Sequence, residues 1–278
     1  MFIPSHTVEQ WIEEDVPGLD LTSHLLGMEA VPAEIHFKAR HETVLSGSEE
    51  AAAVFERLGA KVTFIQPGGT RVSQGDPILT AHGDGEAMHA GWRIALNLLE
   101  YSSGIATRTA KLVEAAQQGG DVLVCGTRKS FPGTRRLSQR ALMAGGGVPH
   151  RMGLGETILV FSHHYRLIGY EAFLQRIPEL KSKAREKKIG VEVDNPDQAV
   201  AVARAGADML QLDKCPPDRI VQVVRAVRQH CPDIIIAAAG GVNGDNAATY
   251  ARTGVDMLVT SWMYFGKPAD ISAVISKP

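Results

Sequence analysis

The spacing of hydrophobic and polar positions divides the chain into two parts of different texture. In residues 1–110, short segments of alternating polarity are separated by turn signals, and stretches of helical spacing lie between them. The strands are expected at residues 33–40, 61–65 and 77–81, and the helices at residues 7–14, 48–58 and 86–117. Short strands mixed with helices in this way are typical of an α+β domain. We expect this domain to end at residue 110.

Residues 111–278 show a more regular alternation of short apolar runs with helical segments. The strands are expected at residues 122–124, 158–161, 190–193, 209–212, 234–237 and 257–259, and the helices at residues 134–144, 171–187, 196–205, 218–229 and 243–252. Apolar strands that alternate with helices are typical of a parallel sheet covered by helices. The pattern predicts a closed or nearly closed α/β barrel. A doubly wound open sheet is the alternative, but no G-x-G-x-x-G follows the first strand to favour it.

Composition and charge exclude several classes of partner. Of the 278 residues, 29 are Lys or Arg and 31 are Asp or Glu, and this net charge of −2 argues against a nucleic-acid or anionic-membrane partner. The longest apolar run, at residues 234–242, has about half the length of a membrane span. The three cysteines form no C-x-x-C pair, and the N-terminus shows no signal-peptide pattern. We therefore expect a soluble, cytoplasmic protein with reduced thiols.

Polar residues gather directly after the expected strands of the second part. In α/β barrels and open α/β sheets, ligands bind beyond the carboxyl ends of the strands. The residues at these ends are Thr127, Arg128 and Lys129 after the first strand, Glu192 and Asp194 after the third, Asp213 and Lys214 after the fourth, Gly240 and Gly241 after the fifth, and Thr260 and Ser261 after the sixth. Cations, carboxylates and a glycine pair are therefore expected to meet at one rim.

Residues 122–155 contain no acidic side chain but carry six cations. These are Arg128, Lys129, Arg135, Arg136, Arg140 and Arg151. Such a stretch predicts a local positive field that concentrates anionic ligands, and arginine forks suit carboxylates and phosphates. For Arg135, Arg136 and Arg140 a solvated basic helix face is an equally good interpretation, whereas Arg128 and Lys129 lie at a strand end.

Two glycine motifs have a functional and an ordinary interpretation. The pair Gly240-Gly241, followed by a helix expected from Asn243, predicts a phosphate cradle at a helix N-terminus, although many strand–helix turns need glycine for steric reasons alone. The triplet at residues 145–147 is either a flexible approach to the cationic pair His150-Arg151 or a plain helix cap.

The candidate metal ligands are also open to two interpretations. Glu192, Asp194 and Asp213 could hold Mg²⁺ directly or through water, or could balance the cationic rim. His163 and His164 resemble a metal site, but adjacent residues on the strand expected there point to opposite faces, so we do not expect them to bind one metal together.

Two runs of residues resemble the signature of a known family. TRKSFPGTR at residues 127–135 and GGGVPHRMGL at residues 145–154 are similar to the signature of the quinolinate phosphoribosyltransferases (nicotinate-nucleotide pyrophosphorylases, carboxylating). The similarity extends over nearly the whole chain. It implies an N-terminal α+β open sandwich domain, residues 1–110, and an incomplete, seven-stranded C-terminal α/β barrel, residues 111–278. It also implies a head-to-tail homodimer in which each subunit contributes to the active site of the other.

The resemblance further implies a Mg²⁺-dependent transfer from phosphoribosyl pyrophosphate to a small aromatic carboxylate, with release of pyrophosphate. Carried over by position, the acceptor would be bound by Thr127, Arg128, His150, Arg151 and Phe161, with Arg93 entering from the partner subunit. The catalytic residues would be Lys129, Glu192 and Asp213, the last two also holding Mg²⁺ directly or through water. The phosphate would be bound by Ala239, Gly240, Gly241 and Ser261.

The sequence departs from the family pattern at the substrate rim. Phe161 stands where the quinolinate enzymes carry a lysine, and Ala239 stands where they carry a serine. The altered run TSWMYFGKP at residues 260–268 is more similar to the ModD branch of the family, pyrophosphorylases of molybdate-transport operons. A pocket with one cation fewer discriminates against a second carboxylate, so we expect weak quinolinate activity or none.

Two alternatives from other classes remain at this point. Lys129 could form a Schiff base, as in an aldolase, which borohydride would trap on a carbonyl substrate. The chain could also be a non-catalytic sensor of a phosphorylated metabolite or an oxyanion, although Lys129, Glu192 and Asp213 are all retained. A Mg²⁺-dependent rise in melting temperature with phosphoribosyl pyrophosphate would indicate binding of that donor.

Overall fold

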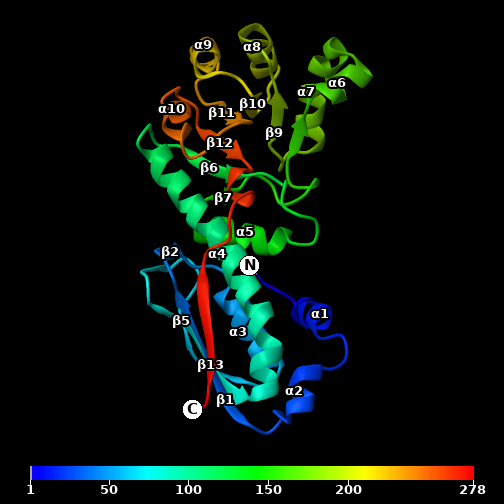
Figure 1. Ribbon diagram of the computed structural model, residues 1–278. Helices are drawn as coiled ribbons and strands as arrows, with labels where there is room; N and C mark the ends of the chain where they lie inside the picture. The colour runs from blue at the N-terminus through cyan, green and yellow to red at the C-terminus, as the bar shows by residue number, and fades with distance from the viewer. Residues whose placement is uncertain (1) are drawn as a thin grey trace. The chain divides into compact units, whose positions relative to one another are not determined.

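The computed structural model describes residues 2–278, which form two compact units (Figure 1). The first unit comprises residues 2–110, 131–146 and 264–278, and the second comprises Lys111–Ser130 and Gly147–Met263. One boundary therefore falls between residues 110 and 111. The inclusion of two later segments in the first unit was not predicted.

The first unit contains a four-stranded antiparallel sheet with the strand order β13-β1-β5-β3. Its strands are β1 (Pro32–Ala39), β3 (Lys61–Ile65), β5 (Pro77–Asp84) and β13 (Ile271–Ser276). The predicted alternation of β1 is confirmed by its side chains, because Ile35 and Phe37 are fully buried while the residues before, between and after them are not. The sequence analysis did not predict β13, which returns from the end of the chain to pair with β1.

The first unit also contains helices and a two-stranded ribbon. The helices are α1 (Ser5–Asp15), α2 (Leu21–Leu26), α3 (Ser48–Arg57), α5 (Arg135–Ala144) and the start of α4 (Gly85–Gln117), and the ribbon is β2 (Thr43–Val44) with β4 (Arg71–Val72). The core joins Phe37 of β1 to Phe55 of α3, whose rings lie 5.9 Å apart. None of the helices in residues 2–278 is long and apolar enough to cross a membrane.

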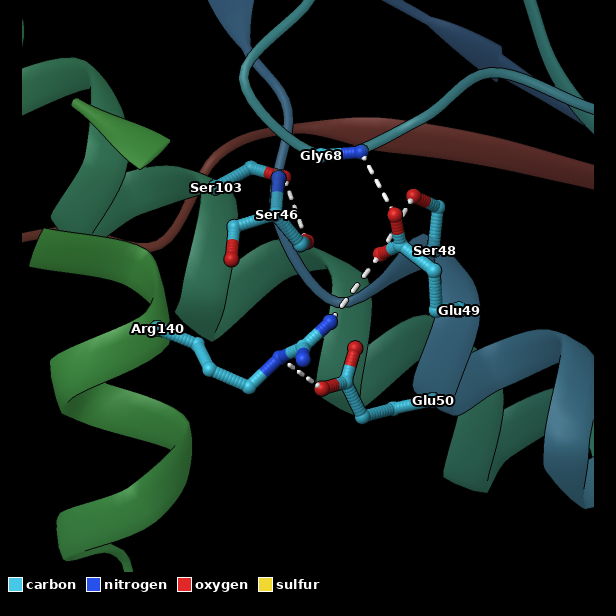
Figure 2. A network of polar contacts seen from close by, with 7 residues as sticks. All are labelled: Ser46, Ser48, Glu49, Glu50, Gly68, Ser103 and Arg140. Carbon is cyan, nitrogen blue, oxygen red and sulfur yellow. Dashed lines mark hydrogen bonds and ion pairs between the residues drawn. The ribbon is translucent and has the colours of Figure 1, made fainter. Parts of the chain in front are cut away.

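A buried ion pair fastens α5 to α3 within this unit (Figure 2). The Nε atom of Arg140 lies 2.6 Å from Oε1 of Glu50, and its terminal nitrogen lies 3.5 Å from Glu49. The Glu49 side chain also accepts a hydrogen bond from the Gly68 backbone. Arg140 therefore has a structural role that differs from both interpretations, because it pairs with a buried carboxylate and neither lies on a solvated face nor lines the cavity at the strand ends of the second unit.

The second unit is a seven-stranded parallel sheet with the order β7-β6-β12-β11-β10-β9-β8. Its strands are β6 (Leu123–Gly126), β7 (Val148–Pro149), β8 (Ile158–Val160), β9 (Ile189–Glu192), β10 (Met209–Asp213), β11 (Ile235–Ala239) and β12 (Met257–Thr260). The strands from β8 to β12 are neighbours in chain order, with none of the reversal that defines a doubly wound sheet. Within the described chain the edge strands β7 and β8 do not pair with each other, so the barrel is incomplete, as predicted.

Helices follow most of these strands. They are α6 (Ser162–Ile168), α7 (Tyr170–Lys183), α8 (Pro196–Arg204), α9 (Pro217–Arg228) and α10 (Ala247–Ala251), with a short 3₁₀ turn, η1 (Trp262–Tyr264), after β12. The sequence pattern missed α6 and β7, which are both short. Two residues define the start of α8. Asn195 caps the first turn by accepting a hydrogen bond from the Gln198 backbone, and Pro196 begins the helix.

Two similar four-residue motifs, at residues 205–208 and 253–256, form the same local structure. Gly206 and Gly254 end their helices with φ angles of +103° and +85°, where a side chain would be strained. The aspartates that follow fix the neighbouring strands: Asp208 accepts a hydrogen bond from the Ile189 backbone and Asp256 accepts one from Ile236. These carboxylates lie at the amino ends of the strands, opposite the predicted rim.

Candidate active site

A cavity of about 370 Å³ opens at the carboxyl ends of the strands of the second unit. Twelve of its lining residues were singled out from the sequence: Thr127, Arg128, Lys129, His150, Arg151, Phe161, Glu192, Asp213, Ala239, Gly240, Gly241 and Ser261. Lys214 and Thr260 were also named at strand ends, without an assigned role, and the remaining lining residues, Leu159, Gln211 and Val259, were not predicted. The polar residues that the sequence placed at separate strand ends thus share one cavity.

The loop after β6 supplies two cations, Arg128 and Lys129. Thr127 extends the sheet, because its N–H donates a hydrogen bond to the Thr260 carbonyl, and its hydroxyl then accepts one from the Lys129 backbone. These two bonds turn the chain at the end of β6 and present Arg128 and Lys129 to the cavity. No ion pair to either cation is present among residues 2–278, so both charges remain available to an anionic ligand.

His150 and Arg151 follow β7 on the same side of the cavity. Arg151 is only 8% exposed, and burial and repulsion from Arg128 lower the pKa of its guanidinium. An anion between the two arginines would relieve that repulsion. Burial, together with Arg151, also lowers the pKa of His150, so near pH 7 this side chain is a neutral hydrogen-bonding group. The sequence analysis grouped it with Arg151 as a cation, which is wrong at that pH.

Phe161 lies at the start of α6 and forms an aromatic wall. Its ring stacks on His163 and His164 at centroid distances of 5.4 and 5.8 Å, and the Arg151 guanidinium lies 5.8 Å from its centre. The two histidines belong to α6, and the prediction that they lie on a strand is wrong. His164 instead caps the helix, since its Nδ1 accepts a hydrogen bond from the Phe161 backbone.

Two carboxylates face this cationic side. Burial raises the pKa of Glu192, and the nearby Asp213 raises it further. The amide of Gln211 donates a hydrogen bond to Glu192 at 3.4 Å and partly offsets this repulsion. Asp194 does not line the cavity. Among residues 2–278 no three His, Cys, Asp or Glu side chains are grouped to hold a metal, so a cation here would have two protein carboxylates and would take its other ligands from water and substrate.

The turn Gly240-Gly241 after β11 brings bare backbone to the cavity. Both glycines have positive φ angles, +77° and +81°, and neither donates a hydrogen bond within the described chain. A Cβ atom on residue 240 would lie 2.5 Å from Oδ1 of Asp213, so only glycine fits there. The expected helix N-terminus is wrong, because α10 begins at Ala247 and has five residues. The exposed N–H groups of the turn, rather than a helix dipole, remain available to a phosphate.

Several residues with an expected or possible role lie elsewhere. Arg93 belongs to α4 in the first unit and does not line the cavity; its guanidinium stacks 4.6 Å from the Trp92 ring centre. Gly145 ends α5, where a Cβ atom would lie 2.3 Å from the Ala106 carbonyl, which supports the plain helix cap. Burial raises the pKa of Tyr264 to about 12, and this tyrosine does not line the cavity.

Comparison with known proteins agrees with the site. Residues 20–103 match the N-terminal domain of quinolinate phosphoribosyl transferase, and residues 105–273 match its C-terminal domain. A pyrophosphorylase named ModD from Rhodobacter capsulatus is 40% identical over 248 residues, 87% of this chain and 94% of that protein. ModD of Pasteurella multocida is 35% identical over 100% of this chain and 99% of its own length.

Solved structures give the same result for the fold. The nicotinate-nucleotide pyrophosphorylase of Francisella tularensis superposes with a TM-score of 0.89 at 26% identity, covering 99% of this chain and 98% of that one. The family and the ModD branch that were inferred from the motifs are both confirmed. The chain belongs to the quinolinate phosphoribosyl transferase family and is an enzyme of the pentosyltransferase class.

Proposed function

We propose that the protein is a Mg²⁺-dependent phosphoribosyltransferase that joins phosphoribosyl pyrophosphate to an aromatic acceptor with fewer carboxylates than quinolinate, releasing pyrophosphate. The observation that carries the proposal is the charge of the cavity. Arg128, Lys129, Arg151 and Lys214 contribute four cations, and Glu192 and Asp213 contribute two carboxylates, so the formal excess is two positive charges. A polyphosphate and a carboxylate are the kinds of ligand that this excess favours.

The positions of the charges match the parts of the donor. The bare N–H groups of Gly240-Gly241 suit the 5′-phosphate, and Ser261 on the next strand lines the same region. Lys129 lies across β12 from that turn, where its cation would offset charge on the departing pyrophosphate. Displacement at the anomeric carbon develops positive charge on the ribose, and the carboxylates of Glu192 and Asp213 would stabilise it.

The same two carboxylates fit a magnesium ion. Mg²⁺ takes few protein ligands and completes its shell with water and substrate phosphate, and the mutual repulsion of Glu192 and Asp213 would be relieved by a cation between them. When bound, the ion would neutralise charge on the pyrophosphate leaving group. Glu192 and Asp213 would hold it, and Gln211 would keep Glu192 in place.

The acceptor side of the cavity argues for one carboxylate rather than two. Arg128 and Arg151 form a cationic pair that suits one anionic group, and the neutral His150 adds a hydrogen bond. The adjoining wall is the Phe161 ring, which can stack on an aromatic acceptor but cannot neutralise a second carboxylate. A buried, unpaired carboxylate is expensive, so this wall should discriminate against quinolinate.

We further propose that two copies of the chain associate and that Arg93 of each completes the site of the other. The family resemblance supports this proposal. Arg93 lies on a different unit from the cavity, and no ion pair to it is present in residues 2–278. Arg93→Ala should raise the KM of the acceptor while leaving that of the donor nearly unchanged.

The test is pyrophosphate release from phosphoribosyl pyrophosphate and Mg²⁺ with a panel of pyridine mono- and dicarboxylates. We expect release with a monocarboxylate and little or none with quinolinate. Phe161→Lys should raise quinolinate turnover, whereas the matched control Phe161→Leu, which removes the ring without adding charge, should not. Strong wild-type release with quinolinate would overturn the assignment of the acceptor, and donor binding without release from any acceptor would favour a sensing role.

A further inference from the structure

Lys214 has an unusual backbone conformation at the edge of the cavity. Its φ angle is +50°, and it is the one residue other than glycine with a positive φ in residues 2–278. This region crowds the Cβ atom against the backbone, and lysine lacks the short polar side chain that lets asparagine or aspartate tolerate it. Strained backbone of this kind persists where the surrounding structure enforces it, and it gathers at functional sites.

The surrounding structure fixes Lys214 in two ways. Its N–H donates a hydrogen bond of 2.7 Å to the Ala239 carbonyl, which continues the pairing of β10 with β11 one residue beyond the strand. Its side chain then runs over Gly240, because a Cβ atom on residue 240 would lie 2.7 Å from Cγ of Lys214 and 2.9 Å from its backbone nitrogen. Gly240 therefore makes room for the lysine side chain as well as for Asp213.

The place of Lys214 in the sheet complements the other cations. Arg128 and Lys129 follow β6, and the sheet order β6-β12-β11-β10 puts β12 and β11 between them and Lys214. The Gly240-Gly241 turn follows β11 and Ser261 follows β12, so the proposed phosphate site has cations on both sides. No ion pair to Lys214 is present in the described chain, which leaves its ammonium available to a ligand.

We propose that Lys214 binds phosphate oxygens of the donor substrate over the Gly240-Gly241 turn. This inference rests on the proposed phosphoribosyl transfer. It assigns to Lys214 a role in substrate binding and accounts for the strained conformation, which carries the lysine side chain over Gly240 at the edge of the cavity. If Lys214 had only a structural role, replacing it with a residue that tolerates a positive φ would stabilise the fold and leave the binding of anions unchanged.

The experiment compares Lys214→Asn with Lys214→Arg and with a matched control, Lys187→Asn. Asparagine tolerates the backbone conformation but removes the charge, and arginine keeps the charge. Lys187 is an exposed lysine two residues before β9, at the amino ends of the strands, so its loss changes the net charge equally but far from the cavity. Binding of inorganic pyrophosphate, either of whose phosphate groups can occupy the Gly240-Gly241 turn in place of the 5′-phosphate, is measured by calorimetry without divalent cations at constant ionic strength, and unfolding is measured in urea.

We expect Lys214→Asn to weaken pyrophosphate binding about 10-fold, because one charge-assisted contact is lost at a partly solvated site. Its stability should equal or exceed that of the wild type. Lys214→Arg should stay within about threefold of the wild type, since the charge is retained, and Lys187→Asn should bind normally. Unchanged pyrophosphate binding by Lys214→Asn, or an equal loss in Lys187→Asn, would overturn the proposal.

A transfer assay separates this proposal from the proposed function. If the wild type releases pyrophosphate but Lys214→Asn keeps the wild-type KM for phosphoribosyl pyrophosphate, the role of Lys214 is refuted and the transferase remains. If the wild type shows no transfer while Lys214→Asn still loses pyrophosphate affinity, Lys214 is supported as an anion-binding residue and the transferase assignment fails.

Discussion

The Glu50–Arg140 pair gives a sharp prediction about stability. The Glu50 carboxylate is 2% exposed and lies 2.6 Å from the Arg140 guanidinium, and neither of its oxygens receives a hydrogen bond from the described residues. Burial raises the pKa of Glu50 above its usual range, and the neighbouring Arg140 limits that rise by favouring the charged carboxylate. The substitution Arg140→Met would leave this charge without compensation, next to the negative Glu49.

The expected cost follows from the burial of the pair. Removing one partner of a buried ion pair costs about 3–5 kcal/mol, and we expect about 3 kcal/mol because the Arg140 side chain is 23% exposed. In a chain of this size that change lowers the melting temperature by about 6–12 °C. The double variant Glu50→Met/Arg140→Met should recover most of the loss, since two apolar side chains of similar length leave no buried charge.

The stability that Arg140→Met loses should also depend on pH. Without Arg140 the pKa of folded Glu50 rises further above its unfolded value, so the folded state holds a proton over a wider range. Such a group stabilises the fold below the unfolded pKa, and this stabilisation is lost as the pH rises through the folded pKa. The deficit of Arg140→Met should therefore be largest near pH 7.5 and should shrink toward pH 5.

Urea unfolding of the single and double variants at both pH values tests this reasoning. Arg136→Met is the matched control, because Arg136 is an exposed arginine on the same helix with no ion pair in residues 2–278. It should cost less than about 0.5 kcal/mol. A deficit of Arg140→Met that is below about 1 kcal/mol, or that does not change with pH, would refute a buried charge at Glu50 as its cause.

Three further predictions concern the cavity. Gly240→Ala should weaken pyrophosphate binding and lower the free energy of unfolding by about 2 kcal/mol or more, because its Cβ would clash with Asp213 and Lys214. Gly241→Ala, whose Cβ meets nothing within 4 Å, should lower the free energy of unfolding by about 1–2 kcal/mol. Calorimetry measures the binding and urea unfolding measures the stability. Asp213→Asn, by removing repulsion from Glu192, should leave the melting temperature without divalent cations unchanged or higher while abolishing transfer; a clear fall in stability would contradict this. The pKa of His150 is lowered in the folded state, so its contribution to stability is lost as the pH falls below about 6.5, and His150→Asn should lose less stability than the wild type between pH 7.5 and pH 5.

The sequence predicted the second unit well because its strands are buried on both faces. The run Ile235–Ala239 is entirely apolar and Met209–Asp213 is apolar at three of its five positions, so hydrophobicity alone indicates these strands. The short elements escaped prediction for a physical reason: β7 has two residues, and α6 has seven, so neither shows enough periodicity. The strand β13 was missed because its partner β1 lies more than 200 residues away in the chain, and local pattern carries no information about such pairing.

The sequence predicted the positions of the site residues better than their protonation states. The rule that ligands bind beyond strand ends gave eight of the twelve predicted residues that line the cavity. His150 and Arg151 came from the cationic stretch, and Phe161 and Ala239 came from the family resemblance. Protonation states depend on burial and distance, which the sequence does not contain, and His150 was therefore taken for a cation. Lys214 was read as part of a strand end, but its positive φ and its path over Gly240 are properties of the folded turn.

Carboxylates at the two ends of the parallel sheet lie in opposite electrostatic environments. At the amino ends, Asp208 is partly buried, which raises its pKa, but the Ile189 N–H and Lys181 lower it overall, so this carboxylate is satisfied within the fold. At the carboxyl ends, Glu192 has a raised pKa, and its strongest charged neighbour is another carboxylate, Asp213. A carboxylate pair left in mutual repulsion reduces stability, and a ligand that supplies positive charge restores it. Neutral substitution of Asp208 should therefore impair folding, whereas neutral substitution of Glu192 or Asp213 should impair binding and spare the fold.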